Sequence, residues 1–96
     1  MAKTLVAVAV SQFTTDKERQ AATVVARELQ VYARQKMPMG CGPDVAEKVI
    51  REGLEDIKFK IKRNPQAYGV DPVTAITVIA ALVNIIYTLV KWFKGE

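Results

Sequence analysis

The sequence predicts an all-α protein: an amphipathic helical hairpin followed by a strongly apolar C-terminal helix, with a short arm or strand before the hairpin. Three observations predict this class. Apolar residues recur at helical spacing through residues 15–36 and 43–63. Turn-forming residues follow each of these segments. The stretch from Pro72 to Val90 contains no charged residue. We therefore divide the 96 residues into an amphipathic region (1–64), a linker (65–72) and an apolar helix (73–94).

The first segment, residues 4–13, is short, apolar and rich in valine. A run of this length fits a strand or an ordered arm, and periodicity alone does not separate these from a helix. Lys3 precedes it, as in a signal peptide, but the apolar run covers only the six residues 5–10. The apolar part of a signal peptide spans about 7–15 residues, so we expect no cleavable signal peptide.

The hairpin begins where Thr15 can cap a helix and Glu18, three residues later, can return the bond. This helix ends before Met37-Pro38. Its apolar face consists of Ala21, Ala22, Val25, Leu29, Tyr32 and Ala33.

Pro43 suits the first position of a second helix, over residues 43–63. Gly53 lies on its apolar face, where it permits a close neighbour. Residues 57–62 alternate with the period of a strand, but Ile57 and Ile61 also continue the helical face, so we prefer a helix. The apolar face consists of Ala46, Val49, Ile50, Leu54, Ile57 and Ile61.

The apolar run after the linker has the length of a membrane span. Asp71 can cap this helix and Pro72 can open it. Residues 73–93 would form a helix of roughly 31 Å, close to the thickness of a bilayer's hydrocarbon core. Aromatic and cationic residues then follow, as at the point where a helix leaves a membrane: Lys91, Trp92, Phe93 and Lys94.

A basic surface accompanies the run. Lysines and arginines beside a span are attracted to anionic lipid head groups. The predicted basic residues are Lys58, Lys60, Lys62, Arg63, Lys91 and Lys94.

A stripe of small and polar residues follows one side of the apolar run at spacings of three and four. In lipid, such a stripe lets helices approach closely and Asn84 hydrogen-bond across the contact. In a soluble oligomer, the same stripe would be the one side that touches water. We place lipid first and leave both alternatives open. The predicted membrane or helix-packing residues are Thr74, Thr77, Ala81, Asn84, Thr88, Trp92 and Phe93.

No set of residues predicts catalysis. The chain has no histidine, which is the commonest general base and metal ligand. Its only cysteine, Cys41, lies between two glycines without the lysine of a phosphate-binding loop. We therefore expect no enzyme, no cofactor, no metal and no small-molecule substrate. The basic stretch at 58–63 could also bind nucleic acid, but acidic neighbours dilute it, so this ranks behind lipid contact.

The basic stretch at 58–63, the linker from Asn64-Pro65 to Asp71-Pro72 and the apolar tail that ends at residue 94 together resemble small proteins of tailed bacteriophages. The resemblance implies a virion component, packed near the portal or delivered into the host envelope. Holins, which permeabilise the host membrane, share the small size and charged ends. A single span with a sizeable polar half departs from most of them.

The first hypothesis is therefore a non-enzymatic structural protein of a phage particle with a membrane-active C-terminal helix, located in the virion or the host cell membrane. The first alternative is a soluble all-helical oligomeric adaptor whose apolar helix is buried between subunits. The second is a holin-like pore former. The expected partners are further copies of the chain, other subunits of a large assembly and membrane lipid.

Overall fold

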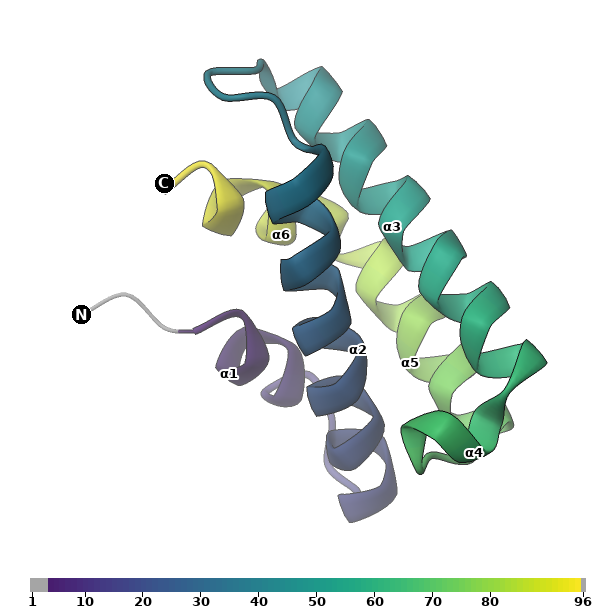
Figure 1. Ribbon diagram of the computed structural model, residues 1–96. Helices are drawn as coiled ribbons and strands as arrows, with labels where there is room; N and C mark the ends of the chain where they lie inside the picture. The colour runs from purple at the N-terminus through teal and green to yellow at the C-terminus, as the bar shows by residue number, and fades with distance from the viewer. Residues whose placement is uncertain (1–3, 96) are drawn as a thin grey trace.

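The computed structural model describes residues 4–95, which form helices and no strand (Figure 1). The all-α class is confirmed. In order along the chain the helices are α1 (Leu5–Val10), α2 (Asp16–Lys36), α3 (Pro43–Arg63), α4 (Pro65–Tyr68), α5 (Pro72–Asn84) and α6 (Ile86–Phe93).

Helices α2 and α3 form the predicted hairpin, joined by the loop at residues 37–42 (Figure 1). At the start of α2, the Thr15 hydroxyl oxygen accepts a hydrogen bond from the Glu18 amide nitrogen at 3.2 Å. The same hydroxyl donates to Glu18 Oε1 at 2.7 Å, so the two residues pair as expected, although through the side chain of Thr15 rather than its amide. Residues 57–62 are helical, as we predicted in preference to a strand.

The predicted arm or strand at residues 4–13 is wrong, because its central part forms α1. The Thr4 hydroxyl caps this helix by accepting from the Ala7 amide at 3.0 Å. Leu5 and Ala9, one turn apart, are both buried and belong to the main core. Contact with α2 therefore decides the conformation of a run whose periodicity is ambiguous.

The linker at 65–72 begins with the single turn α4, which Gly69 ends in a left-handed conformation (φ 64°). Asp71 then caps α5 as predicted. Its Oδ2 atom accepts hydrogen bonds from the Thr74 amide at 3.2 Å and from the Thr74 hydroxyl at 2.8 Å.

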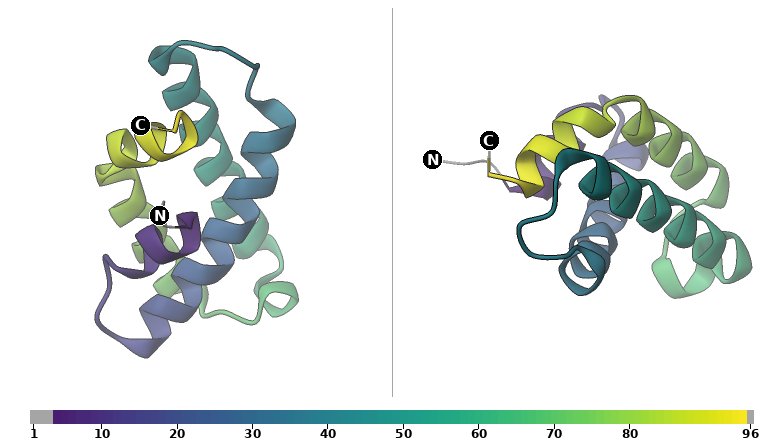
Figure 2. Two further views of the ribbon diagram at one scale, coloured as in Figure 1. Left: turned by 90° about the vertical axis from the view of Figure 1, so that its left-hand side faces the viewer. Right: turned by 90° about the horizontal axis from the view of Figure 1, so that it is seen from above.

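The single helix predicted over 73–94 is also wrong, because the chain bends by 73° between α5 and α6. Ile85 separates the two helices with φ −108° and ψ 26°, without a proline or glycine. The bend turns α6 out of the line of α5 and across the hairpin toward α1 (Figure 2). There Ile86, Leu89 and Val90 are buried, so the bend places the apolar side of α6 in the core.

This bend changes the membrane prediction. Within residues 4–95, no one helix has the length and apolar character needed to span a bilayer. Helices α5 and α6 meet the length and composition criteria only when they are taken together as a bent pair.

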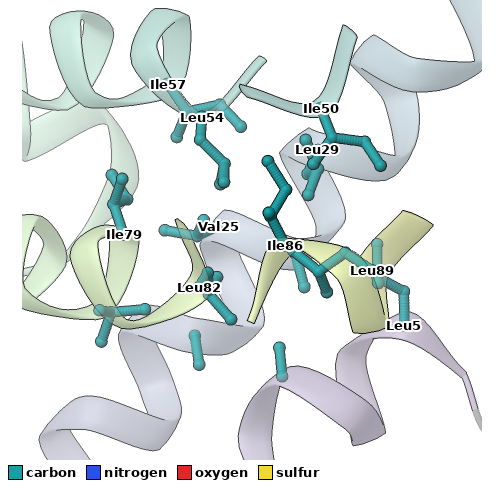
Figure 3. Close-up of a cluster of buried hydrophobic side chains, with 14 of the residues drawn as sticks. Leu5, Val25, Leu29, Ile50, Leu54, Ile57, Ile79, Leu82, Ile86 and Leu89 are labelled. Atoms are coloured by element: carbon teal, nitrogen blue, oxygen red, sulfur yellow. The ribbon is translucent and has the colours of Figure 1, made fainter. Parts of the chain in front are cut away.

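The tail shares one apolar core with the hairpin and α1. Figure 3 shows side chains from α5 and α6, such as Leu82 and Ile86, meeting Val25 of α2 and Leu54 of α3. The Cα radius of gyration is 12.6 Å, close to the value of about 12–13 Å for a compact domain of this length. The core side of the apolar run is therefore covered by the chain's own helices. The largest fully buried side chains are Leu5, Val25, Leu29, Ile50, Leu54, Ile61, Val78, Leu82 and Leu89.

Candidate interaction surface

The side of α5 that faces away from the core carries no charge. Val73, Thr77, Ala80 and Asn84 recur on it at spacings of four, three and four, and all four are exposed. Val73 is 71% exposed, which is high for a valine in the middle of an ordered chain. Half-buried Ile76 and Val83 lie beside them, on the side toward α3. We call these residues the α5 face: Val73, Ile76, Thr77, Ala80, Val83 and Asn84.

An open groove of about 310 Å³ runs between α3 and the α5 face. Glu55 and Lys58 of α3 form one wall, and residues of the α5 face form the other. A second hollow of about 190 Å³ shares Glu55 and Lys58 and continues to Phe59 and Lys62. Phe59 is 61% exposed, so the groove ends at a large apolar side chain in contact with water.

The predicted stripe is divided by the bend. Thr77 and Asn84 on α5 and Thr88 on α6 are exposed, whereas Thr74 and Ala81 are half-buried. Because α5 and α6 differ in direction by 73°, these residues do not form one straight seam. The exposed part of the stripe faces away from the core.

Two of the predicted membrane or helix-packing residues, Trp92 and Phe93, lie against the core. Trp92 and Phe93 are half-buried and pack against the main apolar cluster. Their rings meet edge to face, with 5.1 Å between the centroids and 89° between the planes.

The six basic residues do not form one patch. Lys58 and Lys62 line the hollow beside Phe59. Lys60 instead pairs with Asp56, Nζ to Oδ2 at 3.0 Å, and the hydrogen bond and charge of Asp56 raise the pKa of Lys60. The Lys94 ammonium donates a hydrogen bond to the carbonyl oxygen of Cys41. The remaining two, Arg63 and Lys91, are exposed on α3 and α6.

Val73, Ala80 and Phe59 are exposed residues that were not predicted from the sequence as surface contacts. A signal for the first two exists in the sequence. A core helix needs only one apolar side, whereas the run from Pro72 to Val90 is uncharged on every side. Such a helix has more apolar surface than one small core can cover.

In residues 4–95, no group of three or more histidine, cysteine or acidic side chains is arranged to hold a metal ion. A hollow of about 450 Å³ lies between the loop at 37–41 and the end of α6. Cys41, Phe93 and Lys94 are among its lining residues.

Comparison with known proteins finds no protein family model, curated protein or solved structure that matches this chain.

Proposed function

We propose that this protein is a non-enzymatic structural protein that acts by contact within a larger assembly, and that the α5 face is its contact surface. One observation carries the proposal: four residues of the α5 face are exposed, and no residue of the face is charged. A helix side that remains in water normally carries charged or polar residues, whereas Val73 and Ala80 of this side are apolar and exposed. Covering apolar surface contributes about 25 cal/mol per Å², so this side gains free energy when a partner covers it.

The proposed setting is a phage particle, in which the chain pairs with further copies or with other subunits. The resemblance of residues 58–94 to small phage proteins supports this setting. The packing of the tail favours protein over lipid as the neighbour, because Leu82, Ile86 and Leu89 already have apolar partners within the chain. Lipid insertion would remove these residues from that core.

The experiment is to purify particles from the producing strain and measure the chain by quantitative mass spectrometry. We expect a fixed number of copies per particle. An Ala80→Glu variant, supplied from a plasmid to a strain that lacks the native chain, should be depleted from particles. A Gln12→Glu variant, with the same charge change at an exposed residue outside the α5 face, should be retained. Absence of the native chain from purified particles would overturn the proposed setting.

Membrane insertion is the second candidate, because the bent pair α5 and α6 meets the length and composition criteria for a span. Trp92 is the only tryptophan, so the fluorescence of the protein reports on the surroundings of α6. The full chain is mixed with vesicles of anionic and of neutral phospholipids and floated on a density gradient. Flotation together with a blue shift of Trp92 fluorescence would favour insertion. If insertion occurs, dye leakage from the same vesicles tests the holin-like alternative.

A further inference from the structure

We infer that the groove between α3 and α5 binds a second copy of this chain, in an antiparallel arrangement related by a twofold axis near Ala80. The inference rests on the proposed function and deepens it by naming the partner of the same surface. Its support is the charge pattern and the shape of the groove.

The rim of the groove carries both signs of charge on one helix. Glu55 lies next to Lys58 at the groove, and Lys62 follows one turn further along α3. In an antiparallel twofold pair, the α5 faces of the two copies meet. The α3 helix of one copy then runs alongside the α3 helix of the other in the opposite direction. Glu55 of one copy then faces the lysines of the other, and the same attraction occurs twice because the interface is self-complementary.

This pattern distinguishes the second copy from other occupants. An anionic lipid surface attracts Lys58 and Lys62 but is repelled by Glu55, which lines the same groove. A strongly acidic protein surface meets the same conflict. A partner with mixed charges in matching positions suits these three residues, and a second copy has such charges by construction.

The shape of the α5 face fits a close helix crossing. Ala80 has the smallest side chain of the face and lies between Thr77 and Asn84 along it. Helix axes approach to about 8–10 Å, depending on the side chains at the contact, so the crossing is closest at alanine. The Asn84 amide of one copy then lies near Thr77 of the other and can hydrogen-bond to it, which fixes the register of the pair.

The first experiment tests the position of the axis by disulfide formation in the full chain. Cys41→Ser removes the native thiol, and Ala80→Cys places a new one beside the proposed axis. We expect mild oxidation to give a covalent dimer, because a disulfide requires β-carbons about 3.5–4.5 Å apart. Gln12→Cys in the same background is the matched control and should stay monomeric. Equal crosslinking at both positions would overturn the twofold arrangement.

The second experiment tests the charge pairing by sedimentation velocity. The native chain, 10.6 kDa, should sediment as a dimer. In the first variant, Glu55→Lys makes all three rim residues basic. In the second variant, Lys58→Glu together with Lys62→Glu makes all three acidic. For each variant alone, the dissociation constant of the dimer should rise by about tenfold or more, because like charges then face each other. Mixed together, they should form a heterodimer. Circular dichroism checks that each variant remains folded.

The outcomes separate this inference from the proposed function. A native chain that stays monomeric at all concentrations overturns self-pairing, and so does a mixture of the charge variants that fails to associate. If the Ala80→Glu variant is still depleted from particles in that case, the proposed function of the α5 face as a contact surface holds, and its partner is another subunit. Flotation on anionic vesicles in place of dimerisation would overturn the inference and favour lipid contact.

Discussion

Gly53 of α3 lies directly against the ring of Tyr32 of α2: a β-carbon at residue 53 would be 2.7 Å from Tyr32 Cδ1. The same atom would be 3.0 Å from Leu29 Cδ1. Both distances are shorter than ordinary van der Waals contact, so the hairpin has its present spacing because residue 53 has no side chain.

Gly53→Ala should therefore destabilise the protein, although alanine is the better helix former by about 1 kcal/mol. Overpacking of a well-filled core costs roughly 1–3 kcal/mol, and we expect that cost to exceed the gain. The measurement is the free energy of unfolding in urea. In a Tyr32→Ala background the nearest neighbour is absent and the loss should shrink. An equal loss in both backgrounds would contradict this explanation.

Leu82 tests whether the tail belongs to the core in solution. It is 1% exposed, and Leu82→Ala should cost about 2–5 kcal/mol through lost burial and the cavity left behind. Val73→Ala, also on α5 but 71% exposed, should change the free energy of unfolding by no more than about 0.5 kcal/mol. Similar effects at the two positions would show that α5 does not pack on α2 and α3.

Asp71 should make stability depend on pH. The hydrogen bonds from the Thr74 hydroxyl, and then from the Thr74 amide, lower the pKa of Asp71 below its ordinary value of 3.8. A pKa lowered in the folded state contributes stability that is complete above the unfolded-state pKa and lost as pH falls through the folded-state pKa.

The measurement is the urea midpoint of the native protein and of Asp71→Asn, taken as pH falls from about 5 to about 2. Asparagine still caps a helix but does not titrate. The native midpoint should therefore fall further than that of the variant over this range. Parallel curves would show that the cap does not depend on the charge of Asp71.

Lys94 ties the end of α6 to the loop before α3 through its hydrogen bond to the Cys41 carbonyl. Lys94→Ala should loosen this loop and increase the rate at which a thiol reagent modifies half-buried Cys41. Lys91→Ala removes the same charge from an exposed position of α6 and is the control. If both variants react at the native rate, the hydrogen bond does not hold the loop.

The sequence predicted those parts of the fold that local chemistry determines. The ends of α2 and α3 agree with their caps and prolines, and Gly53 was expected to permit a close neighbour, as it does against Tyr32. Asp71 and Pro72 likewise start α5 where their chemistry requires. The caps and helix ends need only residues that are near one another along the chain. The close approach at Gly53 was predictable because glycine has no side chain, but its partner Tyr32 lies on another helix.

Two features depend on distant contacts, and the sequence did not reveal them. Residues 4–13 have no decisive period, and their helix exists because Leu5 packs into a core built from other segments. The bend at Ile85 has no adjacent proline or glycine from which it could be predicted, and it places α6 against apolar partners from other helices. The candidate surface was located only in part for the same reason. Thr77 and Asn84 were identified from spacing, but the groove beside them requires the position of α3.

The interior has a consequence for how the protein responds to temperature. Among residues 4–95, no polar or charged side chain is buried, so the packing between helices relies on hydrocarbon contact. The free energy of burying hydrocarbon weakens on cooling, because exposing it raises the heat capacity. The free energy of unfolding should therefore pass through a maximum and fall on cooling as well as on heating, so that the helices separate most readily at very low and at high temperature.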